Sequence, residues 1–273
     1  MARTVNLDES YAACRDVVRR ANSSFPLAFR LLAPPKRRAM NALYAFARLT
    51  DDLADEAGEP AEKRERLEAW SESLNLALAG VYSHPTHWAL HDTVLRYGIP
   101  HRHLHDLIEG VRMDLEPVSF ETFDELRIYC YRVAGVVGLA CVRIWGVRPG
   151  ESFERIEPFA EAAGLAFQLT NILRDLGEDR DRGRRYLPRN EDPIDLDFQI
   201  ERARGFYRDA EPLDAALAND GRAVFRVMTG TYRALLEAIA KRPQAVFERR
   251  VRVNKLRKTA IYLSAWPVKW GLR

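Results

Sequence analysis

One segment of this chain combines a strongly apolar helical pattern with a regular line of polar side chains. The segment is GLAFQLTNILRDLGEDRDRGRRYLP, residues 164–188. Its other helical faces carry leucine, isoleucine and phenylalanine, so we expect a buried helix whose polar face meets a cavity or bound cations. The line follows helical steps of three, four and four residues, which place its members on one face: Gln168, Asn171, Asp175 and Asp179.

A second segment, ALYAFARLTDDLADE at residues 42–56, carries a stripe of the same kind. Asp52 adds a further carboxylate beside it. Taken alone, this stripe fits an amphipathic helix whose acidic face meets water equally well. Its likeness to the first stripe favours a helix that faces a polar cavity. Its members follow steps of four, three and four residues: Tyr44, Arg48, Asp51 and Asp55.

Each stripe ends in two carboxylates four residues apart. Facing helices equipped in this way could hold several hard cations between them. Oxygen ligands without histidine or cysteine favour Mg²⁺ or Mn²⁺ over zinc, and Mg²⁺ commonly completes its shell with substrate phosphate oxygens. We therefore predict a Mg²⁺ site for a diphosphate substrate, where the cation would stabilise the departing diphosphate.

Other phosphate, calcium and iron sites lack their sequence signatures. The chain has neither GxxxxGK[ST] nor GxGxxG, which argues against a P-loop and a dinucleotide fold. An EF-hand loop starting at Asp175 would need an oxygen ligand where Gly177 stands, and one starting at Asp179 would need glycine where Arg184 stands. No Glu-x-x-His pair supports a di-iron carboxylate bundle.

Helical spacing of apolar residues extends over most of the chain, and sustained alternation typical of strands is absent. The fold class we expect is all-α. No linker is evident, so we read residues 1–273 as a single domain, with the charged, proline-containing stretch 180–197 as a flap. The predicted helices span residues 8–21, 35–57, 61–79, 86–97, 101–115, 121–146, 150–179, 198–217, 222–242 and 248–264.

Composition narrows the class of partners. The formal net charge is only +3, which does not suggest a nucleic-acid-binding protein. The three cysteines are scattered, as in proteins of reducing compartments. We find no signal peptide and no uncharged apolar stretch of membrane-spanning length, so we expect a cytoplasmic location.

Three segments closely resemble the hallmark segments of the squalene and phytoene synthase family: YAFARLTDDLADE, YCYRVAGVVGLA and FQLTNILRDLGEDRDRGRRYLP. The resemblance implies an isoprenoid synthase helical bundle with a central cavity, Mg²⁺ at both acidic motifs and head-to-head condensation of two prenyl diphosphates. The metal ligands that it implies are Asp51, Asp55, Asn171, Asp175 and Asp179. The substrate contacts that it implies are Tyr44, Arg48, Gln168, Arg174 and Tyr232.

The same resemblance implies a mechanism. Loss of diphosphate from one substrate gives an allylic cation, the double bond of the second attacks it, and proton loss closes a cyclopropane. Asp51 and Asp175 would act through the metal. Tyr129 matches the family's catalytic tyrosine and could orient or relay a proton, although a buried core tyrosine with a satisfied hydroxyl is the alternative. In the flap, Tyr186 and three arginines, Arg182, Arg184 and Arg185, could close over the diphosphate.

The substrate is less defined than the family. The ANSSF segment, residues 21–25, leans toward bacterial presqualene diphosphate synthases, although many family members place histidine where Ala21 stands. We therefore expect two C15 farnesyl diphosphates to give presqualene diphosphate or squalene, in hopanoid or carotenoid biosynthesis. The closest alternative joins two C20 geranylgeranyl diphosphates to phytoene. A more distant one is another class I terpene synthase or a prenyl elongase. NADPH use is left open, because family members that use it also lack a GxGxxG motif.

Two smaller features also leave alternatives open. Gly135 and Gly138 interrupt a strong helical pattern, which indicates close approach of either another helix or a prenyl chain. Phe25 and Phe29 could line the chain-binding pocket or belong to the core.

The C-terminal stretch, residues 249–273, holds eight basic residues, no acidic ones and three aromatic side chains, Tyr262, Trp266 and Trp270. This mixture suits peripheral contact with an anionic membrane, here the inner face. A helix end that packs its aromatic side chains on the bundle is the alternative.

Overall fold

The computed structural model describes residues 6–21, 25–115 and 118–272. This part of the chain is helical and forms no β-strand beyond two isolated bridges, Ser119 to Arg185 and Val147 to Leu217. The all-α prediction is therefore confirmed. The longer helices are α1 (Leu7–Arg20), α3 (Pro34–Asp55), α4 (Pro60–Leu78), α5 (His87–Tyr97), α6 (His101–Arg112), α7 (Phe123–Cys130), α8 (Val136–Trp145), α9 (Phe153–Asp181), α10 (Leu196–Asp209), α12 (Asn219–Ala240) and α13 (Lys255–Ala265).

Shorter elements connect these helices. Two are single α-turns, α2 (Phe25–Ala28) and α11 (Pro212–Ala216). A π-helical turn, η3 (Tyr131–Gly135), joins α7 to α8. The 3₁₀ turns are η1 (Phe29–Leu31), η2 (Met113–Leu115), η4 (Arg189–Glu191), η5 (Pro243–Phe247) and η6 (Pro267–Trp270).

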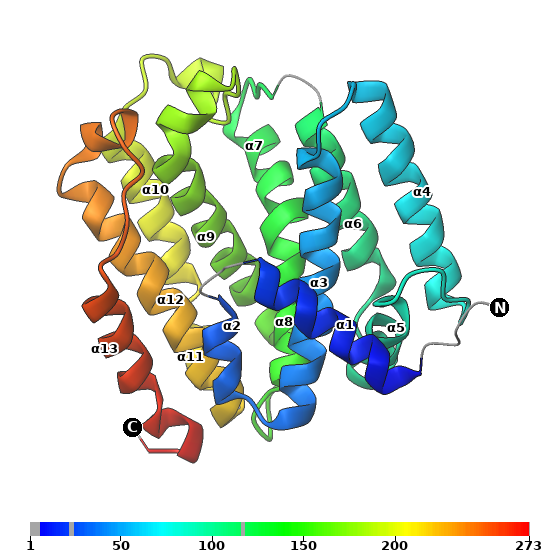
Figure 1. The fold of residues 1–273 in the computed structure, drawn as a ribbon. Helices are drawn as coiled ribbons and strands as arrows, with labels where there is room; N and C mark the ends of the chain where they lie inside the picture. The colour runs from blue at the N-terminus through cyan, green and yellow to red at the C-terminus, as the bar shows by residue number, and fades with distance from the viewer. Residues whose placement is uncertain (1–5, 22–24, 116–117, 273) are drawn as a thin grey trace.

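The helices α3, α6, α8, α9 and α12 lie roughly side by side, and α13 covers one edge (Figure 1). The longest helix, α9, packs against α8, α10, α12 and the π-turn η3. Both α3 and α9 end at the upper end of the bundle in Figure 1, where α6 also ends. This parallel arrangement brings the two acidic motifs to the same end of the molecule.

Local sequence explains where several of these helices begin. Pro34 stands in the first turn of α3, where its missing N–H is not needed. The Ser152 side chain accepts a hydrogen bond from the Arg155 N–H and caps α9. Thr122 caps α7 in the same way. The carboxylate of Glu125, however, binds the N–H of Glu121 instead of closing a full capping box.

The predicted helix 121–146 contains a feature that apolar spacing did not indicate, the π-turn η3. Here η3 and α8 approach α9 very closely. A Cβ added to Gly138 would lie 2.8 Å from the carbonyl oxygen of Ala160, and one added to Gly164 would lie 2.6 Å from that of Ala134. Close helix packing therefore accounts for the glycine at 138 without a ligand, although Gly138 and Gly164 also border the cavity described below.

The stretch Phe123–Trp145 is long and apolar enough to cross a membrane by length and composition. In this structure much of it is buried, and it packs against α6 and α9 inside the bundle. Its apolar character is that of a core helix.

Two other predicted helices differ from the structure. The single helix predicted for residues 198–217 is two helices in the structure, α10 and α11, because Pro212 starts a new turn. The prediction for residues 248–264 was too long at its start, since residues 250–254 have no helical hydrogen bonding. Helix α13 begins only at Lys255, where the Asn254 side chain accepts a bond from the Arg257 N–H.

Candidate active site

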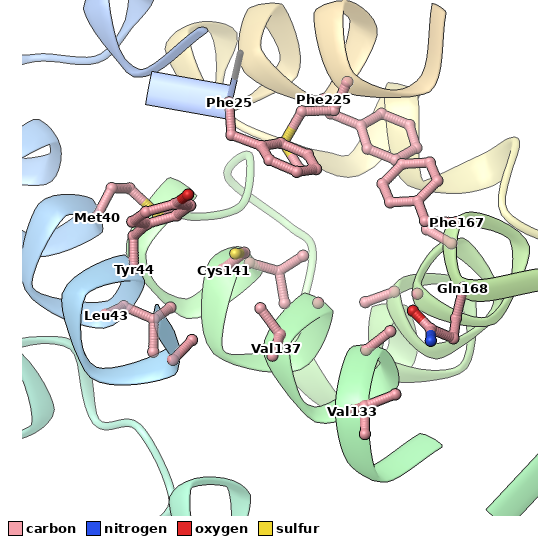
Figure 2. A pocket seen from close by; sticks show the side chains of 18 of the residues that line it. Phe25, Met40, Leu43, Tyr44, Val133, Val137, Cys141, Phe167, Gln168 and Phe225 are labelled. Carbon is pink, nitrogen blue, oxygen red and sulfur yellow. The ribbon is translucent and has the colours of Figure 1, made fainter. Parts of the chain in front are cut away.

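An apolar cavity of about 280 Å³ lies inside the bundle between α2, α3, η3, α8, α9 and α12. Figure 2 shows Tyr44 and Gln168 entering it from opposite sides, with Val133, Val137 and Cys141 along its floor. Trp145, at the last turn of α8, also lines it. Five polar side chains border this space: Tyr44, Asp51, Gln168, Asn171 and Tyr232.

The first acidic motif divides between the cavity and the outer surface of α3. Tyr44 and Asp51 border the cavity. Arg48 instead forms an ion pair with Asp52, which stands outside the predicted stripe. Asp55 is the last residue of α3, where the negative end of the helix dipole favours a cation. The structure thus brings part of the stripe to the cavity and turns the guanidinium away from it.

Asp51 borders the cavity and is exposed to solvent, although protein groups crowd around its carboxylate. The crowded surroundings reduce the hydration of the carboxylate, which disfavours its charged form and raises its pKa to about 7. Arg48 opposes the shift, while the negative charges of Asp55 and Asp114 add to it. Excess negative charge of this kind would be relieved by a bound cation.

The second acidic motif lies on α9, and its first two members, Gln168 and Asn171, border the cavity. The Oδ1 atom of Asn171 is buried without a hydrogen-bond partner in the described part of the chain. A buried acceptor in this condition is unfavourable unless a ligand completes it. Burial and the neighbouring Asp175 raise the pKa of Asp179 to about 6.

Two arginines contact the carboxylate of Asp175 in this motif. Nε of Arg174 donates to Oδ1 of Asp175 at 2.8 Å. Nε of Arg250, from the segment before α13, lies 3.2 Å from the same oxygen. Its guanidinium also reaches Glu178 at 3.3 Å. Arg250 was missed by the sequence analysis, because tertiary folding alone brings residue 250 back to α9.

The predicted metal ligands fit Mg²⁺ by chemistry, although they do not form a closed chelate. Among the residues that the structure describes, no three histidine, cysteine or acidic side chains lie close enough to hold an ion together. The set does offer hard oxygen donors from two helices, including the orphaned Asn171 oxygen. Such an open set suits an ion that takes further ligands from substrate phosphate.

Tyr129 is tied to a carboxylate that the sequence analysis did not identify. Its hydroxyl donates to Oδ2 of Asp114 at 3.0 Å, and the hydroxyl of Tyr186 donates to Oδ1 at 2.9 Å. Burial raises the pKa of Tyr129 well above its usual value. Asp114 lies just after α6 and does not belong to a stripe of polar residues at helical spacing. The pattern of the sequence therefore gave no sign of its role. Its charge raises the pKa of both Asp51 and Asp179, so Asp114 interacts electrostatically with both acidic motifs.

Two of the predicted flap residues, Tyr186 and Arg184, lie at Asp114, whereas Arg185 does not. Partial burial of Arg184 opposes its charged form, but the nearby Tyr186 and the carboxylates of Asp114, Asp55 and Asp179 outweigh this and raise its pKa. Arg185 instead pairs with Asp192 at 2.7 Å.

Aromatic rings form one wall of the cavity. Tyr232 stacks on Phe167 with ring centroids 4.7 Å apart and on Phe25 at 5.7 Å. Tyr44 meets Phe29 edge to face at 6.2 Å. Phe25 and Phe29 therefore line the pocket, as one of the two alternatives expected.

A helical bundle around an apolar cavity, with acidic motifs at one end of two parallel helices, defines the class of isoprenoid synthases. The chain belongs to the squalene/phytoene synthase family, whose family model matches residues 18–191 and 196–257. As a member of this family it is a prenyltransferase, an enzyme that joins two prenyl diphosphates head to head.

Relatives of this family align with nearly the whole length of the chain. It is 35% identical to a 15-cis-phytoene synthase of Synechocystis sp., over 97% of this chain and 86% of that protein. It is also 35% identical to a 15-cis-phytoene synthase of Synechococcus elongatus, over 93% of this chain and 91% of that protein. A solved dehydrosqualene synthase superposes with a TM-score of 0.85 at 26% identity, covering 97% of this chain and 98% of its own.

Proposed function

We propose that this enzyme condenses two geranylgeranyl diphosphates to phytoene. The observation that carries the proposal is an apolar cavity bordered by members of both acidic motifs, Asp51 and Asn171, and reaching Trp145 at the far end of α8. Relatives named phytoene synthases favour the C20 alternative over the farnesyl diphosphate expected from the sequence. The ANSSF segment that favoured C15 substrates includes residues 22–24, which lie outside the described residues.

Residues of both motifs would hold Mg²⁺: Asp51, Asp55, Asn171, Asp175 and Asp179. When bound, the ion would neutralise the diphosphate and stabilise it as a leaving group. Arg174 and Arg250 already lie at Asp175 and could turn from this carboxylate to the diphosphate oxygens. Gln168 borders the same space and supplies amide hydrogen bonds. Arg48 would leave Asp52 to join them.

The cavity wall would protect the cationic stage of the reaction. Apolar side chains exclude water, which would otherwise capture an allylic cation. The faces of Tyr44, Phe167 and Tyr232 offer the negative side of their ring quadrupoles to that charge. The hydroxyls of Tyr129 and Tyr186, both held by Asp114, would orient a proton transfer to the departing diphosphate.

Product analysis tests this proposal. Purified protein is incubated with Mg²⁺ and either farnesyl or geranylgeranyl diphosphate, with and without NADPH, and the products are identified by mass spectrometry. We expect phytoene from the C20 substrate, without a need for NADPH. A C30 product from farnesyl diphosphate at the higher kcat/KM would contradict the C20 assignment while leaving the reaction type intact.

We also propose a cytoplasmic enzyme that contacts the inner face of the membrane through its C-terminal region. Its basic residues and exposed aromatic side chains support this proposal. Removing the region is a poor test, because Ala265 and Val268 are buried and η6 packs on α12. Point substitutions on its outer face are preferable.

A further inference from the structure

A second, smaller apolar groove lies beside the central cavity, between α2, α12 and α13, and encloses about 60 Å³. Three residues line both spaces: Phe25, Met228 and Tyr232. The separation between cavity and groove is therefore formed in part by side chains. Side chains rotate on much faster timescales than the bundle rearranges.

These shared side chains have the properties of a gate. Phe25 stacks on Tyr232 with an interplanar angle of 25°. Phe25 belongs to α2, a single turn of four residues, so its displacement disturbs little helix. Met228 has a flexible, unbranched side chain that adapts to new shapes. Rotation of Phe25 and Met228 would join the groove to the cavity.

The groove is bordered by α2 on one side and by the C-terminal helix α13 on the other. Leu27 is 48% exposed on α2 at the groove, and Lys258 and Tyr262 of α13 form its opposite side. The outer face of α13 and η6 exposes large apolar side chains: Leu256, Leu263, Trp266 and Trp270. Acidic residues are absent from 249–273, whereas basic ones number eight. Apolar and basic groups together match the surface of an anionic lipid bilayer.

We propose that the groove is a side portal through which the hydrocarbon product leaves the cavity into an anionic membrane bound by α13 and η6. This inference rests on the proposed function, because a final product without diphosphate has no partner at the acidic end of the cavity. An exit past Asp51 and the arginines would draw a long hydrocarbon through charged groups. The groove offers an apolar route that ends at lipid.

Blocking the groove without touching the cavity tests the portal. Thr231 lines the groove but not the cavity. Thr231→Phe fills the groove, and Thr231→Ser is the matched control that keeps it open. Leu27→Trp fills the same groove from an exposed position, in case the first variant does not fold. Each variant is assayed with Mg²⁺, geranylgeranyl diphosphate and phosphatidylglycerol vesicles, in single-turnover and steady-state modes.

We expect single-turnover rates within about twofold of wild type but steady-state rates reduced about fivefold or more in the blocked variants, because product release becomes limiting. Thr231→Ser should match wild type in both. Equal steady-state rates in all variants would overturn the portal, as would a single-turnover loss as large as the steady-state loss. If the wild type makes no hydrocarbon even in a single turnover, the proposed function has failed instead.

The membrane face is tested separately, by flotation with phosphatidylglycerol vesicles and without any substrate. Leu263→Asp places a carboxylate on the outer face of α13, where Leu263 is 60% exposed. Leu95→Asp on α5, at a site 68% exposed, is the matched control. We expect Leu263→Asp to lose flotation and Leu95→Asp to retain it. Equal flotation of both variants and wild type would remove the lipid acceptor and with it the proposal.

Discussion

The hydroxyl of Tyr129 donates a 3.0 Å hydrogen bond to the carboxylate of Asp114, which also accepts the hydroxyl of Tyr186. The two phenol rings lie 5.2 Å apart. Tyr129 is thus a buried tyrosine with a satisfied hydroxyl. Its partner, the Asp114 carboxylate, interacts electrostatically with both acidic motifs. The two interpretations of Tyr129 from the sequence are compatible in this arrangement.

Removing this hydroxyl should impair the chemical step. We expect Tyr129→Phe to lower kcat about 10²-fold or more, because a positioned proton-transfer group contributes on that order. KM for the prenyl diphosphate should change little, since Tyr129 does not line the cavity. Steady-state kinetics measure the split. Tyr97→Phe on α5 is the control, and a wild-type kcat in Tyr129→Phe would exclude a role in proton transfer.

The acidic motifs should be essential for turnover and dispensable for folding. Asp51→Asn and Asp175→Asn should each lower kcat/KM about 10³-fold or more, since metal stabilisation of a leaving group contributes several kcal/mol. Circular dichroism should show unchanged helix content. The Asp51→Asn variant should melt at the same temperature or higher, because Asp51 is exposed and the change removes its repulsion with Asp55 and Asp114. Retained activity in both variants would refute the site.

Mg²⁺ binding should release protons near neutral pH. Without metal, the pKa of Asp51 is about 7 and that of Asp179 about 6, so at pH 6 Asp51 is mostly protonated and Asp179 about half protonated. A cation requires the deprotonated forms, so its affinity should fall as pH decreases from 8 to 6. Calorimetry in buffers of different ionisation enthalpy counts the released protons. A pH-independent affinity with no proton release would contradict these shifts.

A buried histidine should limit stability in acid. His87 is 1% exposed, and burial followed by the nearby His84 lowers its pKa to about 4. In the unfolded chain it titrates near its ordinary value of about 6.5. Its neutral form therefore contributes fully above that value, and the contribution is lost as pH falls from there toward 4.

Between pH 7.5 and 5, titration of His87 should remove about 2 kcal/mol from the free energy of unfolding. Urea unfolding at both pH values measures the loss. His87→Gln does not titrate, so its stability should depend less on pH by that amount. The same pH dependence in the variant and in wild type would exclude His87 as the cause.

The close approach of α9 to η3 should make any side chain at Gly164 destabilising. A Cβ at this position would lie 2.6 Å from the Ala134 carbonyl oxygen and 2.7 Å from the Gly135 Cα. Gly164→Ala should therefore destabilise the protein by about 1–3 kcal/mol through overpacking. Gly205→Ala on α10, where only the end of a flexible arginine is near, should be neutral or stabilising. Equal effects of the two changes on chemical denaturation would contradict the packing.

Sequence patterning predicted the helices well because each buries an apolar face, and it identified both polar stripes because helical spacing fixes which side chains share a face. It could not predict that Arg48 turns to Asp52, since two carboxylates lay within reach on the same helix. Asp114 and Arg250 were not predicted as site residues, because only tertiary packing brings them to the site. The π-turn η3 was also missed, since the spacing of apolar residues does not distinguish a single π-turn from the α-helix around it.

The shared metal site of the two acidic motifs is tested most directly by a crystal structure with Mn²⁺ and a thiolodiphosphate substrate analogue, with anomalous scattering used to locate the metal. We expect Mn²⁺ to be bound directly by carboxylate or amide oxygens of both motifs. The ligands should include Asp51 and Asn171, with the diphosphate between α3 and α9 and the prenyl chain toward Trp145. Metal bound by one motif alone, or a diphosphate outside this cavity, would contradict it.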